Sequence, residues 1–241
     1  MKSFFKRALR TLFILTAISA VLCTVISCEQ PGSSSAVLYQ NTNLIWKNVI
    51  KENFSALDGN VYKASYGDWV KFFIVDGELK MFKGSCSYDN SSKATTYKIS
   101  AEEAKSKTFD QLCNEDTDGH FGTYVALEIS DATPNNGKML LLKSGQHSNY
   151  SDGNCYENSS VKENEQHKDC FIPTYISISG NTIIWLEYWS TTVYNEGAAG
   201  TACFANYSTA LNYLPYSKGS WYITEYSKNA SSNLQYWTLV E

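Results

Sequence analysis

The segment 114–119 carries side chains of the type and spacing that bind calcium. Asn114, Asp116 and Asp118 occupy the first, third and fifth positions of an EF-hand-like loop, and Gly119 occupies the sixth. The twelfth position, where this loop needs a bidentate Glu, is Val125. We expect an acidic turn before a strand, with Asn114, Asp116 and Asp118 kept as calcium candidates.

Five cysteines follow position 28 and could form disulfides. Cys155 and Cys170 bracket the second half of a polar insert at about 146–170, so a bridge between them would close a short loop and contribute ~3 kcal/mol. Cys86 and Cys113 form a second candidate pair, so Cys203 has no assigned partner. Connectivity cannot be read from sequence, and reduced, buried thiols are the alternative.

Motifs for catalysis are absent from the sequence. It contains no Gly-x-Ser-x-Gly elbow, no His-Glu-x-x-His and no glycine-rich phosphate loop before a helix. We therefore assign no catalytic residue, no metal centre and no cofactor. Asp and Glu are frequent enough that a hydrolase with two carboxylates stays open as an alternative to a non-enzymatic protein.

Aromatic side chains are the best candidates for ligand contacts, and we single out Tyr188, Trp189, Trp221 and Tyr222. The segment 219–222, Gly-Ser-Trp-Tyr, resembles the Gly-x-Trp-Tyr that opens the first strand of lipocalins. That resemblance implies an eight-stranded barrel holding a small apolar ligand. The segment lies late in the chain, however, and the Arg that packs on the lipocalin Trp has no counterpart here.

An export signal begins the chain. An apolar run over 12–26 is short for a membrane span. Four basic residues precede it: Lys2, Lys6, Arg7 and Arg10. The segment 25–28, Val-Ile-Ser-Cys, resembles the lipobox of bacterial lipoproteins. Cys23 fits less well, because the bulky Leu22 precedes it. An uncleaved signal anchor is the alternative.

The resemblance implies a cleaved signal at 1–27 and acyl chains such as palmitate on Cys28. A flexible Ser-rich tether at 28–36 would then carry a single domain at 37–241. Glu29 stands where an Asp would indicate inner-membrane retention, so we expect an outer-membrane location in the cell envelope. The tether and the Tyr-, Asn- and Lys-rich strands are similar to those of surface lipoproteins from host-associated spirochaetes.

Charge narrows the range of partners. Both arginines lie within residues 1–27, and cleavage there would change the formal net charge from −4 to −8. An acidic chain without Arg is a poor nucleic-acid binder, because phosphate neutralisation and bidentate guanine contacts are both lost. We expect membrane attachment through the lipid, and a host protein, a glycan or a small apolar ligand as partner.

Strand patterns dominate the domain. Asp76-Gly77 separates the apolar runs 69–75 and 78–82, which predicts a type I′ hairpin with Phe72 opposite Met81. Gly180-Asn181 separates the runs 174–179 and 182–187 in the same way. Segments 121–129 and 138–143 form a third expected pair, 221–226 and 234–240 a fourth, and 95–99 a weaker strand.

Helices are expected only as connectors. Ser100 and Glu103 form a capping box that starts one helix running to Leu112, with Glu103 paired to Lys107. Segments 43–54 and 208–214 are further candidates. We predict a mainly β fold, an antiparallel lipocalin-like barrel or a sandwich, that serves as a membrane-anchored binding module. A carrier of a small apolar ligand is the main alternative.

Overall fold

The turn at Asp76-Gly77 joins two strands in the predicted register. Both residues have positive φ, 55° and 82°, as a type I′ turn requires. Strands β3 (Trp69–Val75) and β4 (Glu78–Lys83) pair with Phe72 opposite Met81. The second predicted hairpin is also confirmed: in β9 (Cys170–Ser179) and β10 (Thr182–Glu187), Ile178 lies opposite Ile183.

The computed structural model describes residues 36–42, 44–130, 136–145, 170–187, 189–190, 200–201, 207–212, 214 and 236–241. The remaining strands in this part of the chain are β1 (Val37–Gln40), β2 (Val61–Ala64), β5 (Cys86–Tyr88), β6 (Ala94–Tyr97), β7 (His120–Ile129), β8 (Lys138–Ser144), β11 (Trp189–Ser190), β12 (Gly200–Thr201) and β13 (Tyr236–Leu239). The helices are α2 (Trp46–Phe54), the 3₁₀ turn η2 (Ser55–Leu57), α3 (Ala101–Lys105), α4 (Phe109–Glu115) and α5 (Tyr207–Leu211).

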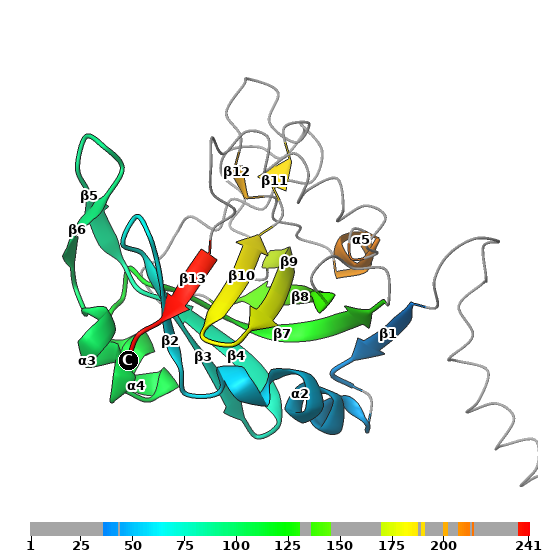
Figure 1. Cartoon of the computed structure of the whole chain (residues 1–241). Coiled ribbons are helices and arrows are strands. Elements are labelled where there is room, and N and C mark those ends of the chain that lie inside the picture. The colour runs from blue at the N-terminus through cyan, green and yellow to red at the C-terminus, as the bar shows by residue number, and fades with distance from the viewer. Residues whose placement is uncertain are drawn as a thin grey trace, which may run out of the picture. The chain divides into compact units, whose positions relative to one another are not determined.

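Eight strands close into an antiparallel barrel (Figure 1). Around the ring they follow chain order, β2-β3-β4-β7-β8-β9-β10-β13, and β13 pairs with β2 to close it. Strand β1 adds to the far end of β7, with Val37 opposite Ile129. The fold is therefore an up-and-down barrel, and the sandwich alternative is wrong.

The expected hairpin between segments 221–226 and 234–240 is only partly described, because 221–226 lies outside the described residues. Strand β13 has β10 on one side, with Ile183 opposite Trp237, and β2 on the other, with Ala64 opposite Trp237. Both edges of the strand are thus taken by the barrel. Closure of the ring joins strands distant in sequence, which the turn residues alone do not predict.

Large side chains fill the barrel interior. Alternate residues of the barrel strands point inward, with one shift at the bulge of β7 between Tyr124 and Ala126. Helix α2 closes one end with Trp46, Val49, Ile50 and Phe54. Inward aromatic rings meet edge to face, with centroids 6.3 Å apart for Phe72–Trp185 and 5.2 Å apart for Trp185–Trp237. The interior is a packed core.

The outer face of the barrel is covered on two sides. Helices α3 and α4 pack on β3, β4 and β7, where they bury Trp69 and Phe82, and the Trp69 indole N–H donates to the Ile99 carbonyl at 2.9 Å. On another side α5 buries Ala210 against β8, β9 and β10. The barrel therefore separates an inner core from two outer apolar layers.

The single helix expected from Ser100 to Leu112 is two helices. The capping box of Ser100 and Glu103 starts α3, as predicted, and a second capping box of Thr108 and Gln111 starts α4. Thr108 is extended, with ψ 166°, so the chain turns there. The expected Glu103–Lys107 pair is also wrong, because Lys107 contacts Glu115 at 2.5 Å while Glu103 serves the cap.

Lys71 holds α3 on the barrel. Its side chain points outward from β3, is 3% exposed, and donates from Nζ to the carbonyls of Ala104, Lys105 and Lys107 at 2.9, 3.0 and 2.8 Å. Burial lowers the pKa of Lys71, while the Asp58 carboxylate opposes that shift. The ammonium satisfies carbonyls at the end of a helix too short to be stable alone.

Replacing Lys71 with Met tests this anchor. The variant keeps an unbranched apolar stem and loses three charge-assisted hydrogen bonds, so the free energy of unfolding should fall by ~2 kcal/mol. Urea denaturation measures the change, and Lys51→Met, at an exposed position of α2, is the matched control. Equal stability of the two variants would show that the three hydrogen bonds add nothing net.

Candidate functional site

One strip of the outer barrel surface lies between the two helix-covered sides. It follows β2 and β13, where the outward residues are Lys63, Ser65, Tyr236 and Thr238. All four are exposed, whereas Val61, also on the outer face of β2, is buried under the α3–α4 layer. The described helices leave this strip open to solvent.

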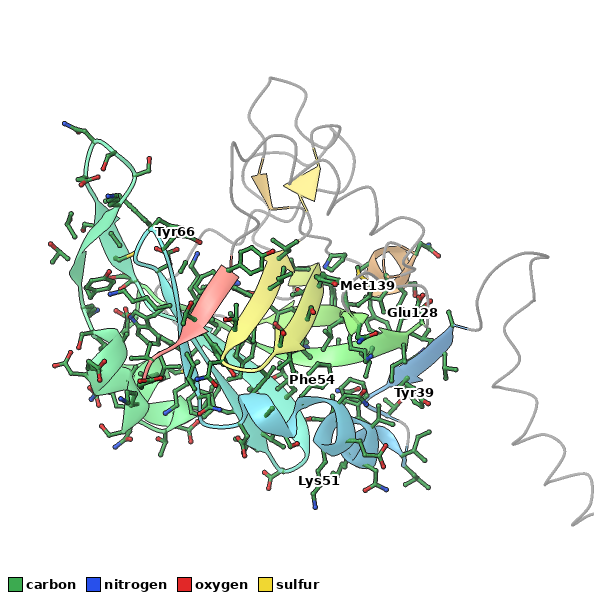
Figure 2. All side chains as sticks on the ribbon, viewed as in Figure 1. Tyr39, Lys51, Phe54, Tyr66, Glu128 and Met139 are labelled. Atoms are coloured by element: carbon green, nitrogen blue, oxygen red, sulfur yellow. The ribbon has the colours of Figure 1, made fainter. Side chains whose placement is uncertain are left out.

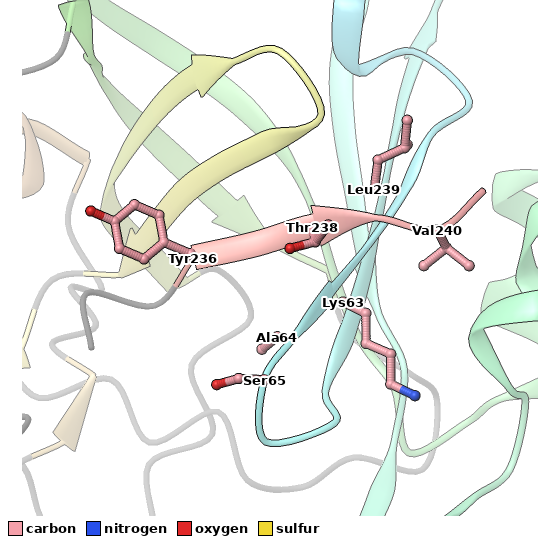
Figure 3. A pocket seen from close by; sticks show the side chains of 7 residues that line it. All are labelled: Lys63, Ala64, Ser65, Tyr236, Thr238, Leu239 and Val240. Atoms are coloured by element: carbon pink, nitrogen blue, oxygen red, sulfur yellow. The ribbon is translucent and has the colours of Figure 1, made fainter. Parts of the chain in front are cut away.

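A groove of about 480 Å³ runs along this strip (Figure 3). We call it the β2–β13 groove, and its lining is Lys63, Ala64, Ser65, Tyr236, Thr238, Leu239 and Val240. Lys63 and Thr238 lie directly opposite each other in the strand pairing. The alternation that sends Trp237 into the core therefore sends its neighbours Tyr236 and Thr238 into the groove.

The β5–β6 hairpin stands beside the groove. The Lys63 ammonium lies over the Tyr97 ring, 5.5 Å from its centroid, and the Tyr97 hydroxyl donates to the Gly67 carbonyl at 2.8 Å. Gly67 has φ +110°, and a Cβ there would lie 2.7 Å from the Tyr97 oxygen. Only glycine permits this approach of the hairpin to the β2–β3 turn.

A buried carboxylate fixes the base of the hairpin. Asp68 is 1% exposed and accepts hydrogen bonds from the Tyr88 hydroxyl at 2.6 Å and the Cys86 thiol at 3.1 Å. Its other oxygen lies 2.9 Å from the Lys83 ammonium. This polar cluster, made of Asp68, Lys83, Cys86 and Tyr88, ties β5 to the β3–β4 hairpin.

The protonation states of the polar cluster follow from burial and charge. Burial alone would raise the pKa of Asp68, but the Lys83 ammonium and the hydrogen bonds from Tyr88, Lys83 and Cys86 outweigh it and lower that pKa. Burial, together with the Asp68 carboxylate, raises the pKa values of Cys86 and Tyr88. Cys86 is thus held as a thiol, which is a poor nucleophile.

The predicted Cys86–Cys113 disulfide is not formed, and both residues are free thiols. Cys86 donates toward Asp68 at the hairpin, whereas Cys113 packs from α4 against the outer layer of the barrel. Burial raises the pKa of Cys113 to about 12. The two side chains belong to different environments, which sequence order did not reveal. Cys155 lies outside the described residues, as does the side chain of Cys170.

Two of the three calcium candidates, Asp116 and Asp118, contact other side chains or the backbone of the protein. Asp116 is fully buried and accepts hydrogen bonds from the Ser85 amide at 2.8 Å and hydroxyl at 2.5 Å. Asp118 is exposed and lies 3.6 Å from Lys98, and Asn114 is exposed on α4. Within the described part of the chain, no three His, Cys, Asp or Glu side chains gather as metal ligands.

The predicted aromatic contacts remain untested. Tyr188, Trp221 and Tyr222 lie outside the described residues, and only the backbone of Trp189 is described, in β11. The groove residue Tyr236, which is 49% exposed, was missed by the sequence analysis. The alternation of inward and outward side chains around Trp237 could have indicated that Tyr236 is exposed. To place Tyr236 in the groove, however, the pairing of β13 with β2 and β10 must be known.

Comparisons with known proteins give no relative: no protein-family model, curated protein or solved structure matches the chain. Among the residues described, no helix has the length and apolarity that a membrane crossing requires.

Replacing Asp68 with Asn tests the polar cluster. The folded pKa of Asp68 lies below its unfolded value of ~3.9, so its stabilisation is present above that value and is lost as the pH falls through the folded pKa. Urea denaturation from neutral to acid pH should show Asp68→Asn less stable than the parent at neutral pH, with the difference shrinking in acid. Asp118→Asn, at an exposed ion pair, should show almost no difference at any pH.

Proposed function

We propose that this chain is a cell-envelope lipoprotein, anchored through Cys28, that binds an acidic glycan in the β2–β13 groove. The observation that carries the proposal is the composition of the groove. It offers a half-exposed Tyr236 ring, the hydroxyls of Ser65 and Thr238, and the Lys63 ammonium. A few polar groups beside apolar surface are typical of ligand sites.

The chemistry of these side chains matches a sugar. An aromatic ring packs on the apolar face of a pyranose, while hydroxyl and ammonium groups pair with the sugar oxygens. None of the described carboxylates lies within ion-pair distance of Lys63, and its ammonium lies over the Tyr97 ring. In an otherwise acidic chain, this positive charge favours a ligand with a carboxylate or sulfate.

Two alternatives have less support. A carrier of a small apolar molecule needs an internal cavity, whereas inward side chains such as Trp185 and Trp237 pack the barrel interior against one another. A hydrolase with two carboxylates needs an Asp or Glu pair in its cleft. The residues that line the β2–β13 groove include neither. Binding on the outer face is therefore the function that we favour.

The anchor part of the proposal rests on the sequence. A basic start, an apolar run and the small Ser27 before Cys28 support a lipoprotein signal. Two or more acyl chains would make the attachment stable, since each buried methylene contributes ~0.8 kcal/mol. The absence of an Asp at position 29, where Glu29 stands, favours a location at the outer membrane.

Glycan binding can be measured on an array of acidic and neutral oligosaccharides, followed by titration with the best acidic member. Tyr236→Ala and Lys63→Gln should each weaken binding about tenfold, a loss of ~1.4 kcal/mol. Tyr236→Phe should keep most of the affinity, because it retains the ring. Lys51→Gln, on α2, is the matched control for charge. Equal binding by all four variants would rule out the β2–β13 groove as the glycan-binding site.

Mass spectrometry of the chain from the membrane fraction of a bacterial host tests the anchor. We expect a mature N-terminus at Cys28 with acyl chains attached, and we expect Cys28→Ser to leave the signal uncleaved. Cys23→Ser should be processed normally. A mature chain with an unmodified Cys28 would contradict the anchor and leave glycan binding unaffected.

A further inference from the structure

We infer that the α2 end of the barrel, defined by the exposed side chains of Leu44, Ile45 and Val75, docks on the surface of the lipid bilayer. The inference rests on the proposed anchor at Cys28 and adds an orientation to it: the domain lies against the membrane by a fixed face. The occupant of this face is therefore the bilayer that carries the anchor.

Exposed aliphatic side chains concentrate in one part of the described chain. Five of them are at least one-third exposed: Val37 at 37%, Leu38 at 44%, Leu44 at 98%, Ile45 at 46% and Val75 at 37%. The first four belong to a stretch of nine positions, 37–45, that directly follows the proposed tether. A Leu that is almost completely exposed is costly in water and is suited to the interfacial region of a bilayer.

The β3–β4 turn lies at the same end of the barrel. The aliphatic stem of Lys47 covers Gly77, where a Cβ would lie 2.5 Å from the Lys47 Cγ. This contact brings the first turn of α2 against the turn that carries Val75, and Figure 1 shows both at the lower end of the barrel. Leu44, Ile45 and Val75 thus belong to one end of the molecule.

The charges at this end suit a zwitterionic surface. Lys51 points away from the barrel in Figure 2, and Lys47 is also exposed, so both ammonium groups can reach lipid phosphates while their stems stay near apolar surface. Glu52 and Asp76 are exposed nearby. Because both signs are present, apolar contact drives the docking and net charge does not.

The tether keeps the α2 end near the bilayer. Eight residues, 29–36, separate Cys28 from the first residue of β1. A flexible segment of that length spans about 16 Å on average and about 30 Å when extended. An acylated Cys28 would hold Val37 within this distance of the lipid, and Leu44 and Ile45 follow only seven and eight residues later. A weak apolar contact is then favoured by a high effective concentration.

Hydrogen–deuterium exchange tests the docking with the full-length chain. The acylated protein is reconstituted in phosphatidylcholine vesicles and compared with residues 29–241, which lack both the signal and the acylated Cys28. The first turn of α2 has no side-chain cap, so its amides exchange fast in water and report contact well. We expect several-fold slower exchange at 44–47 and 75–77 in vesicles, and no change at the β5–β6 hairpin.

A paired variant makes the test specific. Leu44→Asp combined with Ile45→Asp should abolish the protection in vesicles while the barrel strands keep their slow exchange, which shows that the fold is intact. Thr96→Asp, at an exposed position of β6, should leave the protection unchanged.

Each contrary result has a distinct meaning. Acylated, vesicle-bound protein with solution-like exchange at 44–47 would overturn the docking and leave the anchor in place. A chain with unmodified Cys28 that does not sediment with vesicles would overturn both. Protection that appears in residues 29–241 without vesicles, as the protein concentration rises, would identify a second copy of this chain as the occupant and would also overturn the docking.

Discussion

Closure of the barrel by β13 is the constraint on which the rest of the structure depends. Without β13, the other seven strands of the ring would form an open sheet with two unpaired edges and an exposed apolar face. Insertion between β2 and β10 satisfies both edges and brings Trp237 against Trp185 in the core. The side chains of Tyr236 and Thr238 point outward from the same strand, so the β2–β13 groove lies on the outer face of the pairing that closes the barrel.

The packed interior directs function to the outside. Aromatic side chains from several strands and from α2 belong to one buried cluster inside the barrel, so the proposed binding site lies on the outer surface. Two sides of that surface are covered by short helices, and buried polar contacts hold the α3 side in position: Lys71 at the end of α3, and Asp68 at the base of the β5–β6 hairpin. The exposed strip along β2 and β13 is the part of the outer surface that these helices leave uncovered.

Local features could be predicted from the sequence, and distant pairings could not. Asp76-Gly77 determined a register because two residues with positive φ allow a single hairpin geometry. The break between α3 and α4 was missed because Thr108 was read as part of a helical stripe, although Thr108 and Gln111 repeat the capping pattern of Ser100 and Glu103. The groove needs a pairing between β2, only four residues long, and a strand near the other end of the chain.

The order in which the barrel strands leave the ribosome bears on when the barrel can close. The ring begins with β2 and is completed by β13, the last of its strands in the chain. Contacts this distant in sequence form slowly, since the intervening loop must be closed first. The barrel therefore cannot close before β13 has left the ribosome. Until then, β2 and β10 each keep an unpaired edge that is open to pairing with another chain.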